Sequence, residues 1–262
     1  MENRMDIPVK KEEKNSPAIE VRDLVAKYGN RVILDHISFT VPKGEIITIL
    51  GGSGCGKSTL LKHITGLYKP FSGDILLNGR SIVKADEEEK RSIMRSFGVA
   101  YQGGALFRSY TVEENVALPM EEYTLFSREE IRRKVREKLK MVNLDGFEHL
   151  MPADLSGGML KRCAFARAMA LDPQILFFDE PSAGLDPVSS ASLDELILRI
   201  REITGATILI VTHELESIFR ISDRSIMLDA KTKKVLADGP PLMLKNNSPI
   251  EEVRFFLNRG KL

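Results

Sequence analysis

The chain has 262 residues, of which 43% are hydrophobic and 29% charged, and its 38 Lys and Arg residues nearly balance its 37 Asp and Glu residues, leaving a net charge of +1. This composition is that of an ordinary globular protein, and it excludes disordered, collagenous and coiled-coil chains. Because there is no global positive charge, nucleic acid is not an expected partner.

Neither a secretory signal nor a membrane span is expected. Residues 1–17 mix basic and acidic side chains without an apolar segment, so we predict a disordered leader there. The uncharged run at 46–55, IITILGGSGC, is too short and too rich in glycine and serine for a bilayer-spanning helix, which needs about 20 apolar residues. Cys55 and Cys163 are expected to be free thiols of a cytoplasmic protein.

The first two thirds of the chain divide into a β-rich block and a helical block. Short β-rich runs separated by glycine-containing turns fill residues 19–78, so most of this block is predicted to be sheet. From about Asp86 to Leu155 the pattern becomes charged and helical. One face of the predicted helix after residue 127 carries Ile131, Val135, Leu139 and Val142.

Strands and helices alternate in the last third of the chain. The apolar runs at 175–178 and 207–211 are separated by helical patterns, which predicts buried strands of a parallel α/β sheet. A final helical segment places Ile250, Val253 and Leu257 on one face, beside Phe256. This face either packs on its own domain or contacts a second copy of the chain.

A phosphate-binding loop follows the predicted strand EIITIL. The loop fits the pattern G-x-x-x-x-G-K-[ST] and precedes a predicted helix, so backbone N–H groups and a helix N-terminus can converge on phosphate. Lys57 would reach the outer phosphates, and Ser58 would offer its hydroxyl to Mg²⁺. Cys55 suggests a redox-sensitive thiol or, more simply, a small residue that fits. The residues of the loop are Gly51, Gly52, Ser53, Gly54, Cys55, Gly56, Lys57, Ser58 and Thr59.

Two acidic residues stand at the end of the apolar run ILFF, where α/β folds bind their ligands. Asp179 is suited to hold Mg²⁺, and Glu180 to orient or deprotonate an attacking water. A strand capped by acids is the simpler alternative, and the phosphate loop makes it weaker. His213 follows the run TILIV by two residues and is expected to act at the same site.

A second helix N-terminus suited to phosphate is predicted at the sequence LSGGM. Ser156 is a candidate N-cap, and Gly157 and Gly158 would expose backbone donors. One chain therefore offers two separate helix ends to phosphate groups.

The order and spacing of these motifs, with SAGLD at 182–186, resemble the ATP-binding cassette (ABC) family over residues 19 to 239. This resemblance implies an α/β P-loop NTPase with a parallel sheet core, an antiparallel β subdomain and an α-helical subdomain. We accordingly expect an ABC ATPase domain at 18–240, with the helical subdomain at about 103–160, and a C-terminal helical tail at 241–262.

The resemblance also implies roles in the chain's own ATP site. Tyr28 matches the aromatic residue that stacks on adenine, and Gln102 matches the glutamine that touches Mg²⁺ and the attacking water. His213 would contact the γ-phosphate. Lys57 and Glu180 complete the expected catalytic set, with Ser58, Gln102 and Asp179 as the Mg²⁺ ligands.

A second copy of the chain would complete each site. By resemblance, Ser156, Gly157 and Gly158 would contact the γ-phosphate of the nucleotide bound by the other copy, and Asp186 would lie at the dimer interface. Met159 stands where the family usually has Gln, which affects the details of this contact but leaves the backbone donors in place. Hydrolysis of ATP would therefore require a head-to-tail homodimer.

Family resemblance further implies an ATPase subunit at the cytoplasmic side of the inner membrane that powers a separate integral permease. The permease would dock near Gln102–Phe107, where Leu106 and Phe107 are apolar. The segments YQGGALF, TVEENVALP and VRFFLNRG are similar to the ATPases of Mce-type lipid transporters. This similarity implies phospholipid transport and an Mce-type lipid-binding protein as an additional partner.

A soluble ABC ATPase that acts on a scaffold, as in iron–sulfur cluster assembly, is the alternative. Ribosome-associated members usually carry two cassettes in one chain, and chromosome-associated members insert a long coiled coil between the motifs. Neither arrangement fits this sequence.

Overall fold

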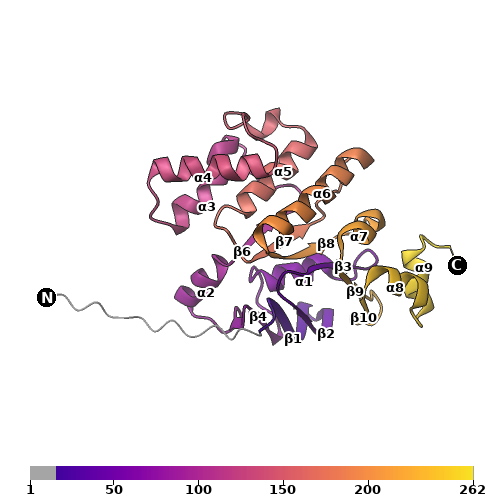
Figure 1. Cartoon of the computed structure of the whole chain (residues 1–262). Helices are drawn as coiled ribbons and strands as arrows, with labels where there is room; N and C mark the ends of the chain where they lie inside the picture. Colours follow the sequence, from indigo (N-terminus) through magenta and orange to yellow (C-terminus); the bar gives the residue numbers. More distant parts are fainter. Residues whose placement is uncertain (1–15, 262) are drawn as a thin grey trace.

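Two β-sheets and a group of helices form the part of the chain that the structure, a computed structural model, describes, residues 16–261 (Figure 1). Nearly all of the predicted leader at 1–17 lies outside these residues. The α/β class and the three expected parts, a parallel core, an antiparallel sheet and a helical layer, are confirmed.

The larger sheet has six strands in the order β10-β9-β3-β8-β7-β6. All neighbours are parallel except β10, which runs antiparallel to β9 at one edge. The central strands β3 and β8 are fully buried, as their continuous Ile, Leu and Val runs predict. The strands are β3 (Ile46–Leu50), β6 (Phe97–Ala100), β7 (Ile175–Asp179), β8 (Thr207–Val211), β9 (Arg224–Leu228) and β10 (Val235–Gly239).

Strand β6 corrects the prediction that the chain is helical from Asp86 to Leu155. It is only four residues long, and its two middle residues, Gly98 and Val99, are half-buried, so it carries neither a long apolar run nor a clear alternation. A close backbone approach marks it instead. A Cβ atom at Gly98 would lie 1.8 Å from the carbonyl oxygen of Ala168, so only glycine fits there.

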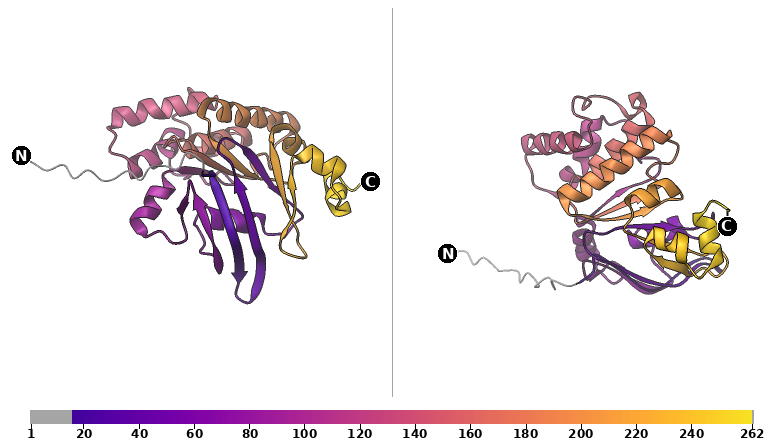
Figure 2. Two further views of the ribbon diagram at one scale, coloured as in Figure 1. Left: turned by 60° about the horizontal axis from the view of Figure 1, so that its bottom comes forward. Right: turned by 45° about the vertical axis from the view of Figure 1, so that its right-hand side comes forward.

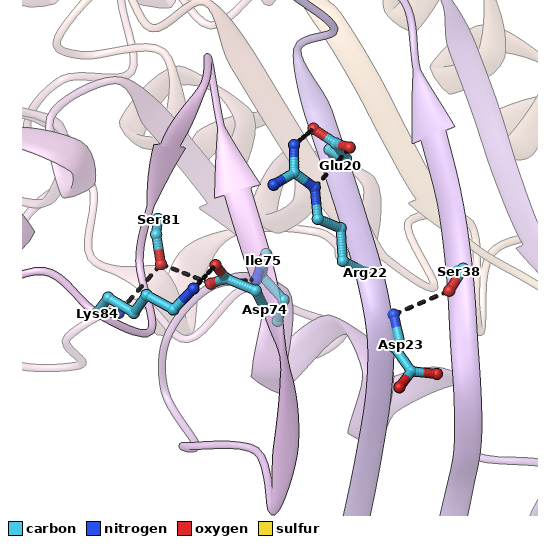
Figure 3. Close-up of polar contacts among 8 residues, drawn as sticks. All are labelled: Glu20, Arg22, Asp23, Ser38, Asp74, Ile75, Ser81 and Lys84. Atoms are coloured by element: carbon cyan, nitrogen blue, oxygen red, sulfur yellow. Dashed lines mark hydrogen bonds and ion pairs between the residues drawn. The ribbon is translucent and has the colours of Figure 1, made fainter.

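The smaller sheet is antiparallel, in the order β2-β1-β4-β5. Its strands are β1 (Ile19–Tyr28), β2 (Arg31–Val41), β4 (Ser72–Leu77) and β5 (Arg80–Ser81). Polar contacts join the last two strands to the loop that follows: Asp74 accepts hydrogen bonds from the Ser81 hydroxyl, at 2.5 Å, and from Lys84 Nζ, at 2.7 Å (Figure 3). On the neighbouring strand, Arg22 pairs with Glu20.

Helix α1 (Lys57–Ile64) lies between the two sheets (Figure 2). Its residues Leu60, Leu61 and Ile64 are buried in one apolar cluster with side chains of both sheets. The helix that follows the phosphate-binding loop is therefore held on two sides.

Most of the other helices gather on the opposite face of the six-stranded sheet (Figure 1). Ser127 and Glu130 form a capping box at the start of α4, and its predicted apolar face from Ile131 to Val142 is buried. A second capping box, of Thr111 and Glu114, begins α3. The helices on this side are α3 (Val112–Tyr123), α4 (Arg128–Met141), α5 (Gly157–Ala168), α6 (Pro187–Thr204) and α7 (Leu215–Ile221). Helix α2 (Glu87–Met94) precedes them in the chain, and the 3-10 turn Pro152–Asp154 lies between α4 and α5.

The end of the chain forms two short helices, α8 (Pro241–Asn247) and α9 (Glu251–Leu257). Val253 and Leu257 of α9 are buried against Leu50, Ile218 and Met227. The apolar face predicted at the end of the chain therefore packs on its own domain. Leu50 is the last residue of β3, so α9 supports the strand that leads into the phosphate-binding loop.

Candidate functional site

The loop at 51–56 connects β3 to α1 and requires glycine at two of its positions. Gly51 has a φ of +143°, and a Cβ atom there would lie 2.5 Å from the Leu228 carbonyl oxygen. Gly56 has a φ of +105°, and its Cβ would lie 2.7 Å from a methyl group of Leu34. A Cβ at Gly52 or Gly54 would meet nothing within 4 Å, so the backbone on that side is open to a phosphate.

Lys57 is the first residue of α1, and its side chain crosses the loop. Its Nζ donates to the carbonyl oxygens of Gly51, at 2.8 Å, and Gly52, at 3.3 Å. Ser58 is exposed beside it. The Cys55 thiol lies 3.9 Å from the Lys57 Nζ and is fully buried in the apolar cluster, which supports the interpretation of a small residue that fits the core.

Asp179 ends β7, on the edge of the sheet where the neighbouring parallel strands also end. Its Oδ1 is buried and has no hydrogen-bond partner among residues 16–261. Burial raises the pKa of Asp179, and the neighbouring Glu180 carboxylate raises it further. The positive charges of Lys62, Lys161 and Lys57 oppose this rise in the pKa of Asp179.

Glu180 and His213 form a pair at the same edge. Oε1 of Glu180 lies 2.8 Å from Nδ1 of His213, which follows β8. The second carboxylate oxygen, Oε2, is buried without a partner in the described chain. The His213 side chain is 58% exposed, so its ring is accessible from the open side of the site. The structure thus brings together two residues that the sequence predicted separately.

Lys161 of α5 joins Gln102 to this group, and the sequence motifs did not reveal it. Its Nζ donates to the carbonyl oxygen of Gln102 and, at 3.3 Å, to that of Glu180. The Lys161 residue is only 8% exposed. The sequence around it carries no distinguishing signal, because Arg162 follows it directly and Arg167 stands in the same predicted helix, so Lys161 looks like one of several ordinary helical cations. The Gln102 residue itself is exposed after β6.

Ser156 is the N-cap of α5, as predicted, and its Oγ accepts from the N–H of Met159 at 3.3 Å. Within residues 16–261 no hydrogen bond joins Ser156, Gly157 or Gly158 to the loop at 51–59. The two helix N-termini therefore remain separate sites in one chain.

Two further predicted residues lie at the edges of the site. Tyr28 ends β1, is 50% exposed and meets the ring of Tyr68 edge-on at a centroid distance of 6.3 Å. Tyr68 was not predicted. Asp186 is the N-cap of α6 and accepts from the N–H groups of Val188 and Ser189, both at 3.0 Å. Asp186 thus has a structural role in its own chain.

The segment after Gln102 presents aromatic rings on the surface. Phe107 and Tyr110 are 51% and 38% exposed, and their ring centroids lie 5.4 Å apart. Leu106, by contrast, packs partly against the helical core. Arg167 of α5 holds the segment by donating to the carbonyl oxygens of Gly104 and Ala105, both at 2.8 Å.

The oxygen atoms at the end of β7 fit a magnesium ion. Mg²⁺ prefers carboxylate, hydroxyl and amide oxygens, and it usually takes only one or two carboxylates from the protein. The unpartnered Oδ1 of Asp179 is one such ligand, near the ammonium of Lys57. No group of three or more His, Cys, Asp or Glu residues suited to a metal exists within residues 16–261, so a metal bound only by such side chains is not expected there.

Comparison with known families identifies the family whose members carry this site. The model of the family described as ABC transporter matches residues 34–183, which is more than half of the chain. The chain belongs to this family. As an ABC transporter ATPase, it binds ATP and hydrolyses it. None of the helices of this ATPase within residues 16–261 combines the length and apolar character that crossing a bilayer demands.

Curated relatives of this ABC ATPase carry two kinds of name. This chain is 43% identical over 246 residues to the probable ribonucleotide transport ATP-binding protein mkl of Mycobacterium leprae. The match covers 94% of this chain and 70% of that protein. This chain is also 40% identical over 241 residues to the intermembrane phospholipid transport system ATP-binding protein MlaF of Haemophilus influenzae, covering 92% of the chain and 90% of that protein.

Solved structures of ABC cassettes share its fold. The dimeric structure of MJ0796, a bacterial ABC transporter cassette, matches with a TM-score of 0.78 and 31% identity, over 85% of this chain and 98% of that one. CbiO1 from Clostridium perfringens, part of the ABC transporter complex CbiONQ, matches with a TM-score of 0.80 and 28% identity, over 94% and 97%. These matches confirm the ABC ATPase fold predicted from the motifs.

Proposed function

We propose that two copies of this ABC ATPase bind two ATP molecules head to tail. In each site, the loop at 51–59 of one copy binds the triphosphate, and Ser156, Gly157 and Gly158 of the other copy contact its γ-phosphate, with Asp186 at the interface. The separation of two phosphate-suited helix ends within one chain supports this arrangement. The MJ0796 cassette, to which the chain is similar, is described as dimeric.

The binding residues divide the nucleotide between them. Tyr28 stacks on adenine, and the Lys57 ammonium neutralises charge on the β- and γ-phosphates. Mg²⁺ would be held by Ser58, Gln102 and Asp179, and when bound it neutralises charge that develops on the phosphate oxygens. Such stabilisation is electrostatic and depends on groups that are already in place before reaction.

Glu180 acts as the base. It accepts a proton from water as the water oxygen attacks the γ-phosphorus, and the bond from that phosphorus to the bridging oxygen of ADP breaks. The observation that carries the proposal is the Glu180 carboxylate, which has one oxygen oriented by His213 at 2.8 Å and the other buried without a partner. The ring of His213 is exposed enough to contact the γ-phosphate as well.

Replacing Glu180 with Gln tests the assignment of the base. The amide keeps the shape of the side chain but accepts protons poorly, so we expect ATP binding to persist while hydrolysis falls on the order of 100-fold or more. Glu216→Gln is the matched control, because Glu216 is exposed and pairs with Arg259 on the surface. Full-rate hydrolysis by Glu180→Gln would refute this role.

We further propose that the ATPase works peripherally at the cytoplasmic face of the inner membrane and powers a separate permease that transports phospholipid. The similarity to MlaF and the sequence segments shared with Mce-type transporters support this cargo over the ribonucleotides in the name of mkl. An Mce-type lipid-binding protein is the additional partner. The exposed rings of Phe107 and Tyr110, beside Gln102, support docking of the permease there.

Docking is tested by replacing Phe107 with Ser in the complex purified with its permease. We expect the complex to dissociate or lose transport while the ATPase alone still binds ATP. Phe126→Ser is the control, because Phe126 is 40% exposed and lies between α3 and α4. An unchanged complex would exclude this docking surface. If the native protein does not pellet with membranes, the scaffold-associated ATPase is favoured instead.

A further inference from the structure

A buried lysine connects helix α5 to two residues of the ATP site. The side chain of Lys161 donates to the carbonyl oxygens of Gln102 and Glu180, which lie far apart in the sequence. Within residues 16–261 its Nζ contacts carbonyl oxygens and pairs with no carboxylate, although the Asp179 and Glu180 carboxylates interact with it electrostatically. Because burying a cation is costly, a lysine that is only 8% exposed needs these two acceptors.

The position of Lys161 in the helix is equally informative. It lies one turn after Gly157 and Gly158, the first residues of α5. A helix is stiff over this distance, so a displacement of its N-terminus carries Lys161 with it. The Ser156 end of α5 is the surface proposed to meet the nucleotide of the second copy.

The carbonyl group of Glu180 is held in an uncommon orientation. Glu180 has a φ of 47°, in the left-handed region that residues other than glycine rarely adopt. Its N–H donates to the Val211 carbonyl oxygen at 2.8 Å, and Lys161 contacts its carbonyl oxygen from the other side. Moving Lys161 therefore changes the surroundings of the backbone that carries the proposed base.

We propose that Lys161 is a positioning residue that links the contact made by α5 with the second copy's nucleotide to Gln102 and Glu180 in the chain's own ATP site. The inference rests on the proposed two-chain site. When α5 engages the γ-phosphate across the dimer, Lys161 holds the Gln102 and Glu180 backbones in the arrangement needed for hydrolysis. The occupancy of one ATP site thereby affects the chemistry of the other.

Replacing Lys161 with Met tests the positioning role, because Met keeps the apolar stem and removes the donors. We expect kcat for ATP to fall on the order of 10-fold to 100-fold, as expected when a reacting group is misplaced, while KM changes by less than about 2-fold. Lys161→Arg keeps a cation with several donors and should restore most of the rate. Lys138→Met is the matched control, because Lys138 is also buried but pairs with Asp172 away from the site.

A double-mutant cycle tests the link itself. If Lys161 transmits the contact made by Ser156, then Ser156→Ala should slow hydrolysis strongly in the native chain but by less than about 3-fold in the Lys161→Met background. In the Lys138→Met background it should slow hydrolysis as much as in the native chain. If Ser156→Ala slows hydrolysis as strongly in the Lys161→Met background as in the native chain, the link is refuted. A kcat for Lys161→Met equal to that of Lys138→Met would also refute it. Absence of ATP hydrolysis by the native chain would instead refute the proposed function.

Discussion

Replacing Asn115 with Ala should loosen the segment that carries Phe107 and Tyr110. Asn115 lies in α3, and its side chain is fully buried. Its Oδ1 accepts from the Phe107 N–H at 2.8 Å, and its Nδ2 donates to the carbonyl oxygens of Phe107, Tyr110 and Thr111 at 3.1, 3.0 and 2.9 Å. One amide side chain thus fixes both ends of the turn before the helix.

The magnitude follows from the donors and acceptors of the amide. The two N–H groups of Asn115 are shared among three carbonyl oxygens, so the side chain makes about three full hydrogen bonds. At a net value of about 1 kcal/mol each, their loss predicts a decrease of about 3 kcal/mol in the free energy that holds the segment folded. Asn115→Asp should cost more, because it places a buried carboxylate against carbonyl oxygens.

Amide hydrogen exchange is the direct assay, because it reports the opening of this segment separately from the rest of the chain. Protection of residues 107–111 should fall on the order of 100-fold in Asn115→Ala, the factor that corresponds to about 3 kcal/mol. Asn247→Ala is the control, since the side chain of Asn247 is exposed and within residues 16–261 its hydrogen bond is to the sulfur of Met243. If protection of 107–111 is unchanged in Asn115→Ala, the amide does not hold the segment and the reasoning is wrong.

Three further predictions concern the core of the protein. Burial alone would raise the pKa of Asp74, but hydrogen bonds from Lys84, from Ser81 and from the N–H of the next residue lower this pKa overall. The contribution of Asp74 to stability is therefore present at neutral pH and is lost as the pH falls through the folded-state pKa. Asp74→Asn should flatten the acid side of a plot of urea midpoint against pH, and an unchanged plot would contradict this. Gly98→Ala should destabilise the protein by more than about 1 kcal/mol, measured by thermal unfolding, because the added Cβ meets backbone. Burial raises the pKa of the Cys163 thiol to about 12, so this residue should resist iodoacetamide at pH 8 until the protein unfolds, and rapid labelling of the native protein would show that the thiol is accessible.

The sequence predicted the parts of the site that depend on local backbone chemistry. The glycine loop, the acidic pair after a buried strand and the Ser156 cap each have a pattern that a short window of sequence contains. Strand order then brings the ends of β3, β7 and β8 to one edge of the sheet, so these motifs meet there. The pairing of Glu180 with His213 follows from this topology.

Other contacts depend on tertiary packing and could not be predicted in this way. Lys161 looks like an ordinary helical lysine until α5 is placed against Gln102 and Glu180. Leu106 and Phe107 are equally apolar in the sequence, yet the structure buries part of one and exposes the other. Strand β6 is recognisable only from its neighbour β7, because its own residues do not form a distinctive pattern.

The packing of α9 against Leu50 has a practical consequence for shortening the chain. A protein that ended at Gly239 would expose the apolar side chains that Val253 and Leu257 cover, next to the strand that leads into the phosphate-binding loop. Such a truncation is expected to promote aggregation and to weaken nucleotide binding together, through loss of support for β3. Residues 241–257 therefore belong to the smallest version of this ATPase that should be expressed for nucleotide-binding measurements.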